Sequence, residues 1–265
     1  MHFSRQLKLL KRGQHSFASH FSVSSLKGRF IGPRVLVNSI PKAGTNLVQE
    51  IVTSLPLMRG WLGRTVTSNA GIEPATKKII KLKRGQSIPS HLSYDDQLAL
   101  IIDNTGIRQI LVVRDPRDLV LSNINYLTRI HTHHPHSRIF SQCVSLDEKI
   151  QLCLSGSRSQ DMMPWPDLVN SYLKWVTSKS TMIVRYEDIV SMTGKISANA
   201  IVRIADHVGV SIDPIAAENV AERVYNTRGP TYFAPGAFKW KTQLTEAQAE
   251  ILTDSFLLFL KEFHY

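Results

Sequence analysis

Three short, mostly apolar runs, each followed by a turn and a helical pattern, constrain the fold of this chain more than any other feature. The runs lie at residues 35–39, 110–113 and 182–184. Apolar runs of this length are typical of strands that are buried on both faces of a sheet. Strands that alternate with helices predict an α/β fold, a three-layer sandwich with a central, mostly parallel sheet.

The 265 residues are enough for one large domain of this class. We expect that domain at residues 34–265 and a basic, flexible tail at residues 1–33. The tail is rich in Ser, and the first acidic residue of the chain is Glu50. Such a start resembles an organellar targeting segment, and the alternative is a basic tail that docks on the domain or on an anionic surface. No apolar stretch is long enough to span a bilayer, so we expect a cytoplasmic protein.

The formal net charge of +11 favours anionic partners. Nucleotides, nucleic acid, sulfated glycans and membrane headgroups all fit this charge. The cysteines Cys143 and Cys153 form neither a metal-ligand pattern nor a disulfide framework.

A first candidate anion site lies where the first apolar run ends. Residues 41–46 form a turn between that strand and the next helix, and the N-terminus of a helix presents free N–H groups to an anion. Gly44 allows a phosphate to approach the backbone, Lys42 adds a charge and Thr45 adds a hydroxyl donor. The lysine precedes the glycine, so this is not the triphosphate-binding Walker A pattern. Taken alone, the segment is equally consistent with an ordinary strand-to-helix turn.

A second candidate anion site repeats this geometry after the second apolar run. Arg114 lies at the end of that strand, where doubly wound sheets bind ligands, and Ser122 follows in the next helix. The alternative is a structural ion pair between Arg114 and Asp118. Two anion sites on one sheet fit a ligand with phosphates at both ends.

Together, these segments resemble the sulfotransferases that use 3′-phosphoadenosine 5′-phosphosulfate (PAPS). Residues 41–46 match the family's 5′-phosphosulfate loop, residues 114–122 match its 3′-phosphate segment, and residues 186–189 resemble its Tyr-Glu-Asp segment. The order and the spacing also agree, from about residue 34 onward. The resemblance implies a fold like that of the P-loop-containing nucleoside triphosphate hydrolases, with PAPS as co-substrate and no metal.

The resemblance also implies roles for single residues. For the 5′-phosphosulfate these are Lys42, Ala43, Gly44, Thr45 and Asn46; for the 3′-phosphate, Arg114 and Ser122; for the adenine, Tyr186. An aromatic residue that often stacks on adenine in the family is replaced here by Leu47.

His91 is the candidate catalytic base. Sulfuryl transfer to an alcohol needs in-line positioning, removal of the acceptor proton and stabilisation of the leaving oxygen. The resemblance aligns His91 with the family's catalytic histidine, just before a helix, and assigns Lys42 to the leaving oxygen. Pro89 stands where many members carry a second lysine. A lone histidine is otherwise more often a surface or capping residue.

The C-terminal part departs from the family pattern. The expected Arg-Lys-Gly of the loop that closes over the 3′-phosphate is replaced by residues 233–235, although Trp240 fits the pattern. The missing cations would come from Arg228, Lys239 or Lys241. A family dimer signature is matched at Lys241, Thr245 and Glu250, but Glu246 replaces its central valine, so we expect a monomer or a weak homodimer.

Several alternatives remain open. The histidine-rich residues 131–136 could bind a metal, although an exposed loop is the better interpretation. The chain could also be a nucleotide kinase, or a non-catalytic protein that binds nucleotides or polyanions. For a sulfotransferase, we expect a small-molecule, glycan or lipid acceptor and no nucleic acid. Acceptor specificity would lie in residues 58–90 and 130–163, which carry no signature of one acceptor.

Overall fold

The three apolar runs become strands of one parallel sheet in a computed structural model that describes residues 23–59, 64–68, 71–226 and 236–265. Within these residues the sheet has five strands in the order β2-β3-β1-β4-β5, and each neighbouring pair is parallel. The strands are β1 (Arg34–Ser39), β2 (Val66–Thr67), β3 (Ser87–His91), β4 (Ile107–Val113) and β5 (Thr181–Arg185).

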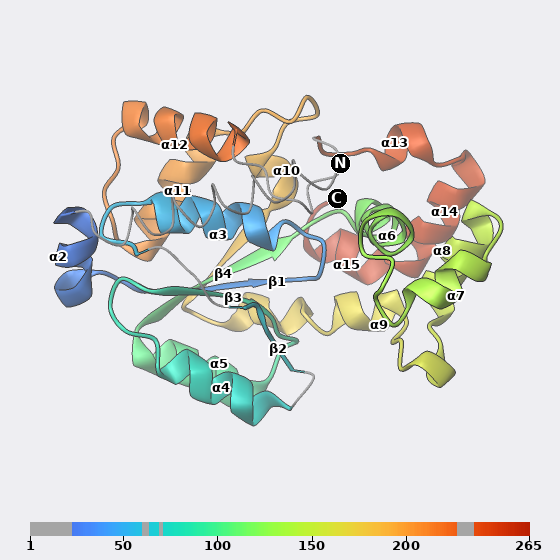
Figure 1. Ribbon diagram of the computed structural model, residues 1–265, viewed down its shortest axis with the longest axis horizontal. Coiled ribbons are helices and arrows are strands. Elements are labelled where there is room, and N and C mark those ends of the chain that lie inside the picture. The colour runs from blue at the N-terminus through green and yellow to red at the C-terminus, as the bar shows by residue number, and fades with distance from the viewer. Residues whose placement is uncertain (1–22, 60–63, 69–70, 227–235) are drawn as a thin grey trace.

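Helices cover both faces of this sheet (Figure 1). One layer contains α3 (Thr45–Ser54), α11 (Ala198–Val208) and α12 (Pro214–Asn226), and the other contains α4 (Ile72–Ile80) and α5 (Asp96–Thr105). Residues of β1 and β4 are almost fully buried between the layers, which explains their apolar sequence. The prediction of a three-layer α/β sandwich is confirmed.

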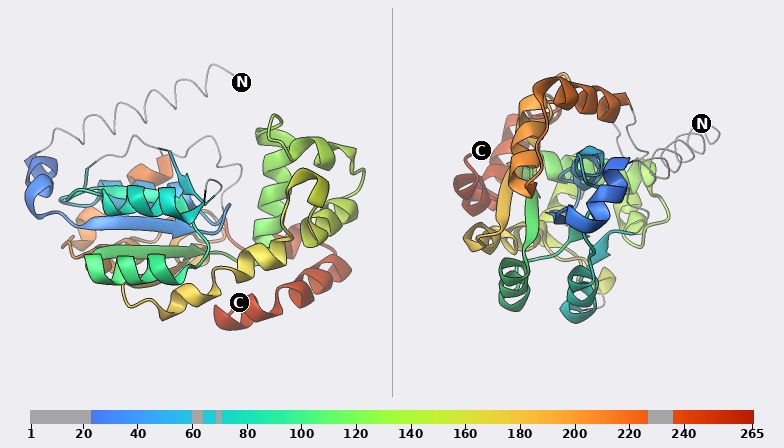
Figure 2. Two further views of the ribbon diagram at one scale, coloured as in Figure 1. Left: turned by 90° about the horizontal axis from the view of Figure 1, so that it is seen from below. Right: turned by 90° about the vertical axis from the view of Figure 1, so that its left-hand side faces the viewer.

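The other helices gather mainly beyond the ends of the strands (Figure 2). Their bounds are α2 (Val23–Ile31), α6 (Pro116–Asn125), the π-helix η1 (Tyr126–Ile130), α7 (Ser137–Gln142), α8 (Leu146–Ser155), the 3-10 helix η2 (Arg158–Gln160), α9 (Trp165–Asn170), the 3-10 helix η3 (Leu173–Thr177), α10 (Tyr186–Ile189), α13 (Trp240–Gln243), α14 (Glu246–Ser255) and α15 (Leu257–Glu262).

The strand order places β1 at the switch point of the sheet. The chain runs from β1 to β3 on one side and then to β4 on the other side of β1. In open α/β sheets, ligands bind in the crevice at the carboxyl ends of the strands that flank such a point. The loops after β1, β3 and β4 therefore meet at one edge of the sheet.

The strand β3 is absent from the sequence prediction, because Pro89 argues against a strand. Proline removes a backbone donor and is tolerated mainly where a strand lacks a second neighbour. Here β2 pairs only with Ser90 and His91, so Pro89 pairs with β1 alone. His91 is thus the last residue of a strand.

Helix boundaries also differ from those predicted. The helix expected from residue 94 begins at Asp96, because the Asp95 carboxylate rather than Ser93 accepts the Leu98 N–H at 2.8 Å. The single helix expected at residues 245–263 is divided into α14 and α15. The break buries both Phe256 and Phe259 in the core.

Part of the expected N-terminal tail is helical. The helix α2 lies within residues 1–33, and the Ser24 hydroxyl accepts the Leu57 N–H at 2.9 Å. A Cβ atom on Gly28 would lie 2.1 Å from the Leu57 carbonyl oxygen, and one on Gly85 would lie 2.7 Å from the Gly28 oxygen. Only glycine permits such close approach of the backbones. Residues 1–22 lie outside the described residues, and the division at residue 33 stays a prediction.

In the part of the chain that the structure describes, no helix has the length and apolar character needed to cross a membrane.

Candidate active site

A cavity of about 590 Å³ opens at the carboxyl ends of β1, β3 and β4. It contains most of the residues that the sequence predicts for the site. Those lining residues are Lys42, Gly44, Thr45, Asn46, His91, Arg114, Ser122 and Tyr186. Ala43 differs, because it is fully buried and its N–H donates to the Ile40 carbonyl at 3.1 Å.

The loop after β1 has the backbone shape of an anion site. Gly44 precedes the first residue of α3 with a φ of 111°, and no side chain caps the helix N-terminus. A Cβ atom on Gly44 would lie 2.7 Å from the ring of Tyr186, so a side chain here would collide with the cavity wall. The first turn of α3 therefore begins beside the cavity with the positive end of its dipole available to an anion.

The Lys42 ammonium lies against an aromatic ring that lines the cavity. Its Nζ lies 3.7 Å from the centre of the Tyr126 ring, a cation–π contact. Burial, and then the charge of Arg114, lowers the pKa of Lys42 to about 8. The lysine therefore carries a charge that an incoming anion would stabilise.

His91 is held in one tautomer by the end of β1. Its Nδ1 lies 2.8 Å from the Ser39 carbonyl oxygen and 3.2 Å from Ser39 Oγ. A carbonyl can only accept, so Nδ1 carries the proton and Nε2 keeps its lone pair. Burial lowers the pKa of His91 and the charge of Lys42 lowers it further, against the hydrogen bond to Ser39. The imidazole is thus neutral at pH 7, as a general base requires.

Asn38 fixes the strand ends on which these groups stand. Its amide donates to the Leu92 carbonyl at 2.9 Å, and its Oδ1 accepts from the Leu92 N–H at 2.9 Å and from the Ser90 hydroxyl at 3.0 Å. The Trp175 indole also donates to the Leu92 carbonyl, at 3.0 Å. Because Asn38 is fully buried, these bonds hold residues 90–92 against β1.

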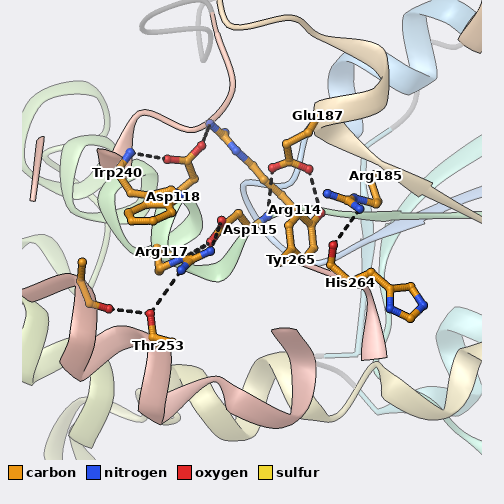
Figure 3. A network of polar contacts seen from close by, with 11 residues as sticks. Arg114, Asp115, Arg117, Asp118, Arg185, Glu187, Trp240, Thr253, His264 and Tyr265 are labelled. Atoms are coloured by element: carbon orange, nitrogen blue, oxygen red, sulfur yellow. Dashed lines mark hydrogen bonds and ion pairs between the residues drawn. The ribbon is translucent and has the colours of Figure 1, made fainter. Parts of the chain in front are cut away.

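Arg114 lies in a wall of the cavity within a network of buried charges (Figure 3), and its Nη1 lies 3.5 Å from the Lys42 carbonyl oxygen. Its Nη2 lies 3.2 Å from Asp118 Oδ2, and its guanidinium stacks 4.3 Å from the centre of the Tyr186 ring. The other oxygen of Asp118 accepts the Trp240 N–H at 2.9 Å. The structural ion pair considered above is therefore real, and Arg114 lines the cavity as well.

Further ion pairs and hydrogen bonds connect the residues that pack around Arg114. Asp115 binds Arg117 through both carboxylate oxygens, and Arg117 also lies 3.8 Å from the centre of the Trp240 ring. The Glu187 carboxylate accepts the Asp115 N–H at 3.0 Å and the Tyr265 hydroxyl at 2.7 Å. Burial raises the pKa of Glu187 despite these bonds. The segment that contains Trp240 is thereby fixed against β4 and α6.

Lys239 adds a cation to the same wall. It lines the cavity with Arg114 and Ser122, and burial followed by the charge of Arg114 lowers its pKa. Lys241 instead lies over the rings of Phe238 and Trp240, at 4.9 and 5.7 Å from their centres. Of the cations considered for the C-terminal loop, Lys239 is thus the one that the described residues place in the cavity. Arg228 and residues 233–235 lie outside the described residues.

Sequence reasoning missed four residues that shape the site: Asn38, Ser39, Tyr126 and Arg129. Tyr126 and Arg129 line the cavity from η1. Asn38 and Ser39 gave a signal, since polar residues at the end of an apolar strand point to hydrogen bonds there. Tyr126 and Arg129 gave none, because their position depends on how η1 packs.

The histidine-rich segment forms an aromatic cluster beside η1. His131 stacks on Tyr126 with 5.4 Å between ring centres, and the ring centres of His134 and His136 are 4.8 Å apart. Among the described residues, no group of three or more potential ligands could hold a metal ion. The segment therefore packs against the site, next to a second cavity of about 350 Å³.

Comparisons with known proteins agree with this geometry. Residues 32–229 match the sequence model of a family described as "Sulfotransferase domain". No curated protein sequence matches the chain.

Solved structures resemble the whole fold at low sequence identity. Mouse sulfotransferase SULT7A1, complexed with PAP, is 16% identical, with a TM-score of 0.63 over 92% of this chain and 91% of that one. Retinol dehydratase, in complex with androsterone and the inactive cofactor PAP, is 14% identical, with a TM-score of 0.56 over 89% of this chain and 83% of that one. At this identity the likeness shows the fold, and the predicted P-loop-like architecture is confirmed.

Proposed function

The chain belongs to the sulfotransferase family, and on this premise we propose that it transfers a sulfuryl group from PAPS to a hydroxyl or amine of an acceptor. The observation that carries the proposal is one cavity that combines an uncapped helix N-terminus, the Lys42 ammonium and a neutral His91 with a free Nε2 lone pair.

The donor would lie in the cavity with its two phosphate groups bound by different sets of residues. Lys42, Thr45, Asn46 and the first turn of α3 would hold the 5′-phosphosulfate, and Ala43 would support the loop. Arg114, Ser122 and Lys239 would hold the 3′-phosphate. The Arg114–Asp118 pair has no net charge, so the ammonium of Lys239 supplies the net positive charge for this phosphate. Tyr186, stacked on Arg114, would contact the adenine, and Leu47 supplies an apolar surface in the same cavity.

The reaction would be an in-line displacement at sulfur. The acceptor oxygen or nitrogen forms a bond to sulfur while the bond from sulfur to the bridging phosphate oxygen breaks. His91 Nε2 takes the acceptor proton, and Lys42 stabilises the charge that develops on the bridging oxygen. The products are the sulfated acceptor and 3′-phosphoadenosine 5′-phosphate. No step of this scheme requires a metal.

The test is calorimetric titration with 3′-phosphoadenosine 5′-phosphate, 5′-AMP and ATP at two salt concentrations. We expect the bisphosphate to bind at least about tenfold tighter than 5′-AMP, or about 1.4 kcal/mol. Turnover is then measured as release of the bisphosphate from PAPS with a panel of phenols, alcohols, amines, sugars and sterols.

Two other results would overturn the proposal. Equal binding of all three nucleotides with a steep loss at high salt would indicate a non-catalytic polyanion-binding protein. Tight binding of ATP with Mg²⁺ would indicate a nucleotide kinase.

For the acceptor, we propose a small molecule, a glycan or a lipid, and not a nucleic acid. For the assembly, we propose a monomer or a weak homodimer in the cytoplasm. Thr245 belongs to the segment that resembles the family dimer signature. Its side chain caps α14 in a reciprocal pair with Gln248 of the same chain, which supports this proposal. The match at Thr245 is therefore accounted for within one chain.

A further inference from the structure

The Ser39 side chain lies between the two groups that the proposed reaction needs. Its Oγ forms a short hydrogen bond with Thr45 Oγ1 at the start of α3, and it lies 3.2 Å from His91 Nδ1 at the end of β3. Ser39 is fully buried, so these contacts are shielded from solvent. One hydroxyl therefore contacts both the candidate 5′-phosphate subsite and the candidate base.

The direction of these hydrogen bonds follows from the available protons. His91 Nδ1 donates to the Ser39 carbonyl, so the Ser39 hydroxyl can only accept from the same N–H. The proton of the Ser39 hydroxyl is then left for Thr45 Oγ1. The proton of the Thr45 hydroxyl consequently turns away from Ser39, and Thr45 lines the cavity.

We propose that Ser39 is a positioning residue that connects the 5′-phosphate subsite at Thr45 with the imidazole of His91. The inference rests on the proposed function, because the anion that it needs is the 5′-phosphate of the donor. When that phosphate accepts the Thr45 hydroxyl proton, the hydrogen bonds from His91 through Ser39 to Thr45 all point the same way and strengthen one another. A stronger bond from Nδ1–H makes Nε2 a better proton acceptor, so the base becomes stronger once the donor is bound.

A direct electrostatic effect accompanies this connection. Lys42 is the charged group that lowers the pKa of His91, and Arg114 lies in the same cavity. A bound donor neutralises part of both charges and raises the pKa of His91 without any help from Ser39. The test must separate the two effects.

Two substitutions, each of which removes one buried hydroxyl group, separate the effect of the hydrogen bonds from the direct electrostatic effect. Ser39→Ala removes the connecting hydroxyl and leaves the Ser39 carbonyl in place. Ser87→Ala is the matched control, because Ser87 is also buried on β3, four residues before His91, and its hydroxyl accepts from the Gln49 amide at 2.8 Å. His91 is titrated by nuclear magnetic resonance in the full chain, with and without 3′-phosphoadenosine 5′-phosphate.

We expect the nucleotide to raise the pKa of His91 in the wild type and in Ser87→Ala. In Ser39→Ala, the increase in the proton-binding constant should be about threefold smaller, the effect of one hydrogen bond of ordinary net strength. Equal increases in all three proteins would overturn the inference. Failure of the wild type to bind the nucleotide would instead overturn the proposed function.

A second comparison does not depend on whether Ser39→Ala folds. In the wild type, adenosine 3′-phosphate lacks the 5′-phosphate and should raise the pKa of His91 clearly less than the bisphosphate does, because only its direct electrostatic effect at Arg114 remains. An increase equal to that caused by the bisphosphate would show that Thr45 and Ser39 play no part. Thr45→Ser and Thr45→Val extend this comparison, because only serine keeps the hydroxyl.

Discussion

The two walls of the cavity are held in different ways. The 5′ side (residues 38–46 and 91) is fixed by neutral hydrogen bonds between the ends of two adjacent strands. The 3′ side (residues 114–122, 186–187 and 239–240) is fixed by charged groups, such as the Asp118 carboxylate, which binds both Arg114 and the distant Trp240 N–H.

This difference agrees with the proposed roles of the two sides, proton transfer on the 5′ side and anion binding on the 3′ side. On the 5′ side, burial and the charge of Lys42 keep His91 neutral, so that it can take a proton. On the 3′ side, the Asp118 carboxylate holds the guanidinium of Arg114 in one orientation beside the cavity. Substitutions on the 5′ side should therefore change turnover, and those on the 3′ side should change stability or affinity.

The largest expected effect is on turnover. His91→Ala should lower kcat by about 10²–10⁴-fold, since it removes the proposed general base, while nucleotide affinity stays nearly unchanged. His133→Ala, in the exposed part of the histidine-rich segment, is the control. The kcat is measured from the release of 3′-phosphoadenosine 5′-phosphate, and the nucleotide affinity is measured by calorimetry. Full turnover of His91→Ala would remove this residue from the mechanism.

The next effect is on stability. Asp118→Asn should lower the free energy of unfolding by about 3–5 kcal/mol, because it leaves Arg114 without its buried partner. Urea unfolding measures this loss. Asp206→Asn, at an exposed position of α11, should change stability by less than about 0.5 kcal/mol. Equal stability of the two variants would mean that the pair does not hold the 3′ side together.

A smaller effect distinguishes two neighbouring lysines. Lys239→Ala should weaken binding of 3′-phosphoadenosine 5′-phosphate about tenfold, the effect of one charge-assisted contact, and leave 5′-AMP binding unchanged. Lys241→Ala should change neither affinity, since Lys241 lies over Phe238 and Trp240. A loss for both nucleotides in Lys239→Ala would place this lysine elsewhere in the site.

The smallest effect is a dependence of affinity on pH. The pKa of Lys42 is about 8 in the free protein, and the donor binds its charged form. Affinity should therefore fall about twofold from pH 7 to pH 8 and more steeply above pH 8, by at most about tenfold per pH unit. Lys42→Arg keeps its charge and should remove most of this decrease. A flat profile in the wild type would contradict the assignment.

The same contrast explains what the sequence could predict. The 5′ side is encoded by consecutive residues, so the phosphate loop and the role of Gly44 are visible in the sequence. His91 was predicted only from the resemblance to a family pattern, because Pro89 argues against the strand that ends at His91. Local turn chemistry is readable, whereas a proline in a strand depends on which neighbours the strand has.

Each segment of the 3′ side could be found in the sequence, but the way in which the segments meet could not. Arg114 and Ser122 follow a strand and occupy a recognisable segment. The choice of Lys239 rather than Lys241 depends on the bond between Asp118 and Trp240, whose residues lie 122 positions apart in the sequence. The positions of Tyr126 and Arg129 depend on the π-helix that continues α6, and no apolar period announces such a helix.

The junction of glycines around Leu57 has a practical consequence for protein engineering. A recombinant fragment that begins at residue 34, where the first strand starts, would lack α2 and with it the hydroxyl of Ser24 that accepts the Leu57 N–H. It would also uncover the Gly85 backbone, against which Gly28 packs without room for a methyl group. A fragment that begins before residue 23 retains this junction.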